Sequence, residues 1–131
     1  MTRHIEEVYA RLATDGHDVT VYTRRAPLGS DYRGLRVQTV PAVSASPWDR
    51  VSYSAVASTR AAAARFDVVH YHSYSNSGWC FVPRAAGAKV LMTVHRLEWL
   101  DEKWGGAGRA VLRANAWVTH RVAEAFIAVS P

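Results

Sequence analysis

The spacing of apolar residues in the first third of the chain predicts one helix and two strands. Ile5, Val8 and Leu12 are spaced to form a single apolar stripe on a helix, which Gly16 would end. A short run of strand-forming residues follows that glycine. A second run alternates between apolar and polar residues and ends at a proline, so we expect a half-buried edge strand there. The predicted ranges are 2–14 for the helix and 19–23 and 35–40 for the strands, with a loop over 24–34.

In the rest of the chain, helical and strand patterns alternate. A Ser-Pro pair at Ser46 and Pro47 is typical of a helix start, because proline suits the first helical position. Short apolar runs predict strands, and longer stretches with helical spacing predict helices. Three helices are predicted: one over 46–65, a short one that follows the loop at 73–78 and ends at about 86, and one over 107–124. The predicted strands cover 66–72, 90–95 and 125–129.

This alternation predicts the α/β class, with a parallel sheet, right-handed crossovers and helices on both faces. In such a sheet the carboxyl ends of all the strands meet at one edge, and ligands bind outside that edge. Polar residues follow several of the predicted strands. We therefore expect one crevice to receive side chains from Arg24, Arg25, His70, His72, His95 and Ser130.

The most informative stretch is residues 89–104, where an apolar strand stops at His95. A polar and aromatic segment follows, and it carries Arg96, Glu98, Trp99, Lys103 and Trp104. A buried strand that ends at an ionisable side chain and leads into a charged loop is how open α/β sheets build a binding site. We therefore expect the functional site around this segment.

Composition narrows the function classes. The 131 residues suit one domain with one core, and 49% hydrophobic with 21% charged residues is ordinary globular usage. The net charge is +5 and comes from 14 Arg and 2 Lys against 11 acids, but the basic residues are scattered, which argues against a nucleic-acid arm. A single cysteine excludes an internal disulfide. No apolar stretch is long enough to span a bilayer, and the charged N-terminus is unlike a signal peptide, so we expect a cytoplasmic protein.

The histidines admit three interpretations. His95 could act as a hydrogen-bond donor or general acid/base on a ligand, or it could only cap loop carbonyls. His70 and His72 point to one face of their strand and, with His95, could ligate zinc in a hydrolase. The H-x-H pattern is weak evidence for a metal, because Glu98 is the sole nearby candidate for a catalytic base, so we expect no metal. We expect His72 to line the crevice and His70 to pack in the core.

Other candidate residues have plain structural alternatives. Trp99 and Trp104, with Lys103, could form a platform for a sugar or lipid, but a hydrophobic plug between loop and helix is the favoured interpretation. The arginines of the first loop, Arg24, Arg25 and Arg33, could contact phosphates, although a solvated loop is the simpler explanation. Cys80 is expected to be a small buried side chain. The sequence contains neither G-x-G-x-x-G nor a P-loop, so it gives no support for a dinucleotide or ATP site.

Several segments together resemble family 4 glycosyltransferases of the GT-B fold. The stretch Gly16-His-Asp-Val-Thr-Val is similar to their second strand, and Phe66-Asp-Val-Val-His-Tyr-His72 is similar to their D-V-V-H-x-H segment. The later motifs resemble a bacterial subgroup that builds surface polysaccharides and is often described as rhamnosyltransferase-like; they are Thr93-Val-His95, Leu97-Glu-Trp99, Lys103-Trp-Gly105 and Ile127-Ala-Val-Ser130.

The resemblance implies a Rossmann-like N-terminal domain that holds the acceptor, followed in the family by a C-terminal domain that binds a UDP- or GDP-linked sugar. Transfer would retain the anomeric configuration and need no metal or organic cofactor. His95 would lie near the transferring sugar as the candidate catalytic residue. The candidate substrate-binding residues are His70, His72, Arg96, Trp99 and Lys103.

The chain departs from the family pattern in three respects. The first strand, with its Gly-Gly loop, is expected before residue 2, the C-terminal domain is expected after Pro131, and Arg96 stands where the family has glycine. We therefore expect residues 1–131 to be an incomplete acceptor-side domain, marginally stable and unable to transfer sugar alone. The acceptor would be a sugar or a lipid-linked glycan, with possible contact with the inner membrane surface. The alternatives are a non-catalytic α/β module that pairs with a separate partner domain, and the histidine-ligated metal hydrolase.

Overall fold

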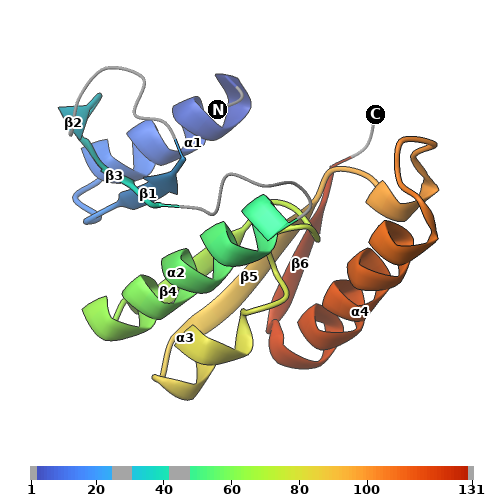
Figure 1. Ribbon diagram of the computed structural model, residues 1–131. Coiled ribbons are helices and arrows are strands. Elements are labelled where there is room, and N and C mark those ends of the chain that lie inside the picture. The colour runs from blue at the N-terminus through green and yellow to red at the C-terminus, as the bar shows by residue number, and fades with distance from the viewer. Residues whose placement is uncertain (1–2, 25–30, 42–47, 130–131) are drawn as a thin grey trace. The chain divides into compact units, whose positions relative to one another are not determined.

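The computed structural model describes residues 3–24, 31–41 and 48–129. The chain divides into two compact units, residues 1–41 and 42–131, and each is described by itself (Figure 1). The expected helix start at Ser46 and Pro47 lies outside the described residues. No helix among those described has the length and apolar character needed to cross a bilayer.

The first unit packs one helix against a small sheet. Helix α1 (Arg3–Thr14) ends through Gly16, whose φ of 94° is the left-handed conformation that glycine adopts easily. Strand β1 (Thr20–Thr23) pairs in parallel with β3 (Leu35–Thr39). Leu35, Val37 and Val40 are the buried apolar side chains of this unit.

Strand β3 is the centre of its sheet, so the expectation of an edge strand was wrong. A two-residue strand, β2 (Asp31–Tyr32), pairs antiparallel with it, and the order is β1-β3-β2. The turn between β2 and β3 places Arg33 at φ 53° and Gly34 at φ 81°. Two successive positive φ values are typical of a tight type I′ hairpin turn. The sequence did not predict this hairpin, because arginine is an uncommon residue at the first such position.

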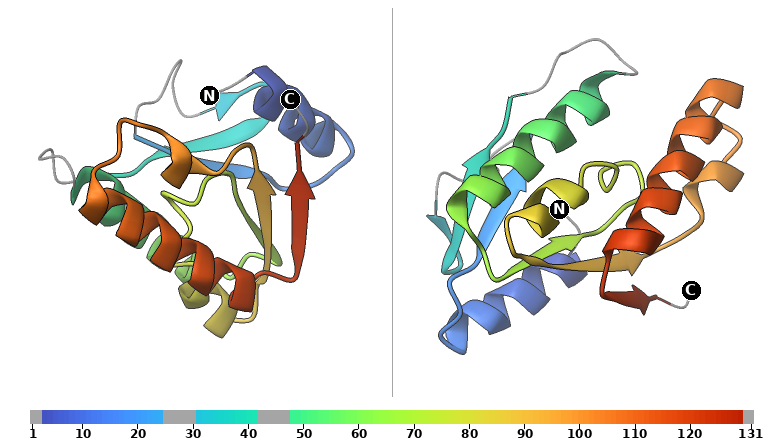
Figure 2. Two further views of the ribbon diagram at one scale, coloured as in Figure 1. Left: turned by 90° about the vertical axis from the view of Figure 1, so that its right-hand side faces the viewer. Right: turned by 90° about the horizontal axis from the view of Figure 1, so that it is seen from below.

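The second unit is built from parallel strands and covering helices. The strand order is β4-β5-β6, with β5 in the centre and both pairings parallel. Figures 1 and 2 show helices α2, α3 and α4 on one side of this sheet. The elements in chain order are α2 (Trp48–Ala64), β4 (Val68–Tyr71), α3 (Phe81–Ala85), β5 (Lys89–Val94), the single-turn 3₁₀ helix η1 (Glu98–Leu100), α4 (Gly106–Val122) and β6 (Ala125–Ala128).

The core of the second unit lies between the sheet and these helices. Strand β5 contributes Val90 and Met92, both fully buried, and α4 contributes Leu112 and Ala116. Cys80 is fully buried in the same cluster, as expected. Because side chains alternate along a strand, the side chains between these core residues point to the other face of the sheet. The buried core of the unit therefore includes side chains of β5 and α4, and His95 directly follows β5.

The predicted α/β class with parallel strands is confirmed, and the described strands form two sheets. Within the described residues β1 pairs with β3 and β4 pairs with β5, which gives two three-stranded sheets. Alternation along the sequence predicts strand type and direction. It does not fix which strands become hydrogen-bonded neighbours, because pairing depends on contacts between distant segments. A common sheet edge therefore applies to the strands of each sheet separately.

Candidate functional site

His72 and His95 lie together at the carboxyl end of the second sheet. They follow β4 and β5, which are adjacent and parallel, with Tyr71 opposite Met92 in the register. The ring centroids of the two histidines are 5.9 Å apart and the rings are stacked at 30°. Neighbouring parallel strands end at one edge, so their following residues meet there. The structure thus brings together the two imidazoles that the sequence placed at one edge.

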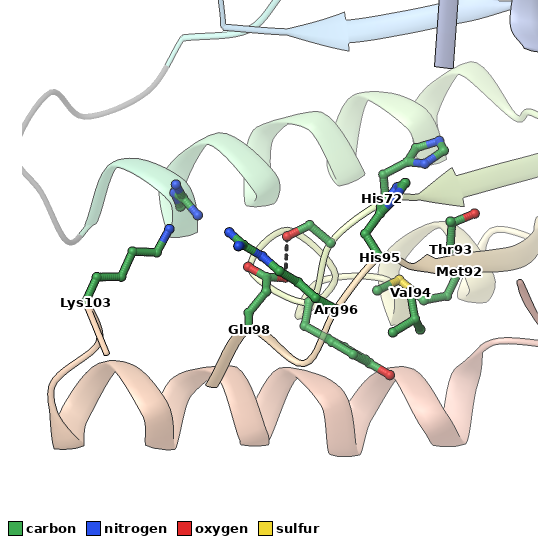
Figure 3. A pocket seen from close by; sticks show the side chains of 11 residues that line it. His72, Met92, Thr93, Val94, His95, Arg96, Glu98 and Lys103 are labelled. Atoms are coloured by element: carbon green, nitrogen blue, oxygen red, sulfur yellow. Dashed lines mark hydrogen bonds between the residues drawn. The ribbon is translucent and has the colours of Figure 1, made fainter. Parts of the chain in front are cut away.

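A cavity of about 210 Å³ opens beside these rings. Figure 3 shows His72 and His95 at one end of it and Lys103 at the other. The lining comes from α2, from the loop after β4, from the end of β5 and from the segment that leads into α4. The lining residues are Arg50, His72, Ser73, Tyr74, Met92, Thr93, Val94, His95, Arg96, Glu98 and Lys103.

Glu98 anchors the loop that follows β4. Its side chain is only 8% exposed, and its carboxylate accepts hydrogen bonds from Ser73 Oγ at 2.6 Å and from the Ser75 backbone N–H at 3.3 Å. The two serine hydroxyl oxygens are themselves 2.6 Å apart. A buried carboxylate is costly unless donors satisfy it, and here the loop supplies them. Glu98 therefore holds in place the segment immediately after His72.

The same carboxylate affects Tyr74, which is buried beside it. Burial, and to a smaller extent the negative charge of Glu98, raise the pKa of the Tyr74 hydroxyl above its ordinary value. The Tyr74 hydroxyl also shares a hydrogen bond of 3.1 Å with His120 Nε2 on α4. Tyr74 therefore stays a neutral phenol that links the cavity wall to α4.

Cationic side chains reach the cavity from separate elements. Arg50, on α2, donates a hydrogen bond of 3.3 Å to Ser75 Oγ, and its guanidinium carbon lies 5.5 Å from the centroid of the Trp104 ring. Lys103 Nζ lies 5.4 Å from the same centroid. Arg96 is paired with Asp101 at 3.2 Å. The Trp104 ring is thus shared by two cations, an arrangement that cation–π attraction favours.

His70 lies next to this site but does not line the cavity. Its Nε2 shares a hydrogen bond of 2.7 Å with Thr93 Oγ1, and its ring centroid is 4.2 Å from that of His72. Desolvation, followed by the nearby charge of His95, lowers the pKa of His70. The expectation that His70 packs in the apolar core was wrong. It is half-buried on the other face of the sheet, because its neighbour Tyr71 is the residue that points into the core.

Trp99 and Trp104 form the hydrophobic plug that the sequence favoured over a platform. Both are partly buried and pack against the core cluster of the second unit. The Trp99 ring lies 5.4 Å from the Tyr74 ring and does not line the cavity. Of the predicted substrate-binding side chains, His72, Arg96 and Lys103 line the cavity. His70 and Trp99 do not line it; their rings lie against those of His72 and Tyr74 respectively.

The described arginines of the first loop belong to the first unit. Arg24 and Arg33 are exposed and belong to the unit of residues 1–41, whereas the cavity lies in the second unit. Arg25 and Ser130 lie outside the described residues. The strands that precede Arg24 and His95 belong to different sheets, and the convergence of these residues with the histidines stays a prediction.

The described residues give no support to a metal site. Among them, no three His, Cys, Asp or Glu side chains are placed so that they could hold an ion. His70 Nε2 is engaged with Thr93 Oγ1, and Glu98 is held by two serines.

Sequence reasoning missed two residues of the cavity. Arg50 lies on a helix more than twenty residues before His72, and nothing in the helical pattern distinguishes it from a solvated arginine. Glu98 was considered only as a base for a zinc site. Its proximity to two serines of another loop is a tertiary contact. A Ser-x-Ser pair directly after a strand that ends in histidine is the signal that could have suggested a polar anchor.

A family comparison bears directly on what this site does. The family model of Glycosyltransferase Family 4 matches residues 1–131. This chain belongs to glycosyltransferase family 4. Comparisons with curated proteins and with solved structures gave no match.

The membership agrees with the architecture of the second unit. Parallel strands flanked by helices form half of a GT-B fold in this family, as the resemblance of the motifs implied. In this family 4 glycosyltransferase the polar cavity lies at the carboxyl end of β4 and β5, where α/β sheets bind ligands. The cavity is therefore the candidate site for a substrate of glycosyl transfer.

Proposed function

We propose that this chain is the acceptor-side N-terminal domain of a retaining glycosyltransferase. Joined to a C-terminal nucleotide-sugar domain, it would transfer a sugar from a UDP- or GDP-linked donor to a glycan or lipid-linked acceptor. The observation that carries this function is the pairing of His72 and His95, 5.9 Å apart, at a polar cavity in a chain that belongs to family 4. The motif resemblance favours surface-polysaccharide synthesis of the rhamnosyltransferase-like subgroup.

In this proposal His95 hydrogen-bonds the transferring sugar or its phosphate. His95 is exposed at the cavity mouth, so a sugar can reach its imidazole. A donor that is aimed at charge developing in the transition state accelerates transfer more than one that only binds the ground state. His72 and Lys103 shape the acceptor pocket, and Arg96 narrows its rim.

Transfer requires no metal ion or organic cofactor in this proposal, and the nucleotide-sugar is a co-substrate. The enzyme would work in the cytoplasm at the inner membrane surface, where lipid-linked acceptors are available. Trp117 on α4 is 59% exposed and carries the Arg121 guanidinium 3.6 Å from its ring centroid. An exposed tryptophan beside a cation is a combination that suits the interface of an anionic bilayer.

The test is a transfer assay on this chain joined to a family 4 donor domain, with UDP- and GDP-sugars and a panel of glycan acceptors. We expect His95→Ala to lower kcat by about 100-fold, the usual loss when one transition-state hydrogen bond is removed. His17→Ala, at an exposed position of the first unit, is the matched control and should leave kcat unchanged. A chelator should have no effect.

One result would contradict the role of His95, and another would contradict the transferase function. Equal kcat in the His95→Ala variant and the unmodified enzyme would remove His95 from the reaction. Acceptor binding without transfer, for every donor tested, would instead favour a non-catalytic module that pairs with a separate partner.

A further inference from the structure

The cavity gathers three cationic side chains from three parts of the chain. Arg50 comes from α2, Arg96 follows β5, and Lys103 precedes α4. Figure 3 shows Lys103 extending from its loop toward α2, across the cavity from His95. Cations that converge from separate elements are held there by the fold as a whole, unlike neighbouring charges on one exposed helix face.

Arg50 and Lys103 both lie near the ring of Trp104. The guanidinium carbon of Arg50 is 5.5 Å and the ammonium nitrogen of Lys103 is 5.4 Å from the Trp104 centroid. Two like charges over one ring repel each other, and cation–π attraction offsets only part of that repulsion. A bound anion would offset the repulsion that remains between the two cations.

Two acids near the cavity contact neighbouring side chains. Glu98 is the one acidic residue of the cavity lining, and it is held by Ser73 and Ser75. Asp101 pairs with Arg96. The cavity lining thus carries three cations, one of which is paired with Asp101, against the single carboxylate of Glu98. Arg50 contacts the hydroxyl of Ser75 rather than a carboxylate.

We propose that this cavity binds a phosphoryl group carried by the acceptor. Arg50 and Lys103 supply two positive charges, and His72, His95 and Ser73 supply further polar atoms in the same cavity. A dianionic phosphate matches two cations, whereas a carboxylate would neutralise only one. The assignment rests on the proposed function, because it specifies the chemistry of the acceptor in that reaction.

Binding of small anions to this chain, measured by isothermal titration calorimetry, tests the assignment. The probes are methyl phosphate, with acetate as the carboxylate of similar size. We expect methyl phosphate to bind at least tenfold more tightly than acetate. Lys103→Gln and Arg50→Gln should each weaken methyl phosphate binding about tenfold, the loss expected for one charge-assisted contact.

Arg113→Gln is the matched control, because Arg113 is an exposed residue of α4 that does not line the cavity. It should bind methyl phosphate as the unmodified chain does, and circular dichroism of each variant checks the fold. Equal affinities for methyl phosphate and acetate, no binding of methyl phosphate, or an equal loss in Arg113→Gln would each overturn the assignment.

Further probes separate the sources of the phosphoryl group. A short prenyl diphosphate that binds more tightly than methyl phosphate identifies a lipid-linked acceptor, and tighter binding of a sugar phosphate identifies a phosphorylated glycan. Both support the assignment. If UDP or GDP binds more tightly than either and competes with methyl phosphate, the cavity belongs to the donor and the acceptor assignment fails.

Failure here is distinguishable from failure of the proposed function. Anion binding is measured on this chain without a donor domain, whereas transfer is measured on the joined enzyme. Efficient transfer to neutral acceptors, together with no phosphate binding, would overturn the phosphoryl assignment and leave the transferase function standing.

Discussion

At the scale of single residues, the surroundings of His70 on β4 make it sensitive to pH. His70 is half-buried, hydrogen-bonded to Thr93 Oγ1, and close to the ring of His72. Desolvation first, and the charge of His95 second, lower its pKa from the ordinary value of 6.5. The neutral imidazole is therefore the form that the folded chain prefers.

This preference predicts a loss of stability in mild acid. Below pH 6.5 the unfolded chain binds a proton at this position more readily than the folded chain does. The contribution of neutral His70 to the free energy of unfolding should therefore be fully present above pH 6.5. It should fall as the pH drops below 6.5, until the pH passes the pKa of His70 in the folded state. Urea unfolding between pH 5 and 8, a range of about three units around the ordinary histidine pKa, measures this slope.

His70→Gln should remove most of that slope, whereas His17→Gln, at an exposed position of the first unit, should keep it. An unchanged slope in His70→Gln would show that another group titrates. The readout is the slope and not the stability itself, because losing the bond to Thr93 shifts stability at every pH.

At the scale of elements, the first turn of α4 packs closely against the Trp104 ring. A Cβ atom added at Gly108 would lie 2.8 Å from Cε3 of the Trp104 ring, closer than two carbon atoms can approach. Trp104 is also the ring beneath Arg50 and Lys103. The small residue at position 108 therefore sets where the tryptophan lies, and with it the two cations.

Gly108→Ala should lower the free energy of unfolding by about 1–3 kcal/mol, the usual cost of overpacking. Gly106→Ala, in the same turn, is the matched control, because a Cβ there meets nothing within 4 Å. Since alanine favours helix over glycine, the control should be neutral or stabilising by up to about 1 kcal/mol. Urea unfolding measures both variants, and equal effects would contradict the close contact with Trp104.

At the scale of the whole molecule, the two units differ in how much apolar surface they bury. The first unit buries Leu35, Val37 and Val40, whereas Val8 and Leu12 of α1 are 39% and 37% exposed. The second unit buries a larger cluster around Val90, Met92 and Leu112. Small units with little buried apolar surface open more readily than large ones.

Hydrogen exchange should therefore show two levels of protection. We expect the amides of β1 and β3 to exchange at least about tenfold faster than those of β4 and β5, which corresponds to an opening free energy lower by about 1.4 kcal/mol or more. Mass spectrometry of peptides from residues 18–40 and 66–95 provides the comparison. Equal protection in both segments would mean that the units open together.

The sequence by itself determined the strands, the helices and the polar end of β4 and β5. Apolar spacing separates the two element types because helices and strands differ in period, and parallel direction follows from the helices between strands. His72 and His95 could be placed at one edge on this basis alone, since each directly follows a strand of the same sheet. The resemblance of the motifs to family 4 was also available without coordinates.

The tertiary structure decided the strand partners and the chemistry of the cavity. Strand β2 pairs with β3 through an unusual turn, and the strands divide into two sheets. Arg50 and Lys103 lie near the same Trp104 ring although they are distant in the sequence. Local periodicity carries no information about such contacts, because they depend on how whole elements pack. For that reason the sequence indicated where a ligand would bind, and only the fold showed the positive charge that meets it.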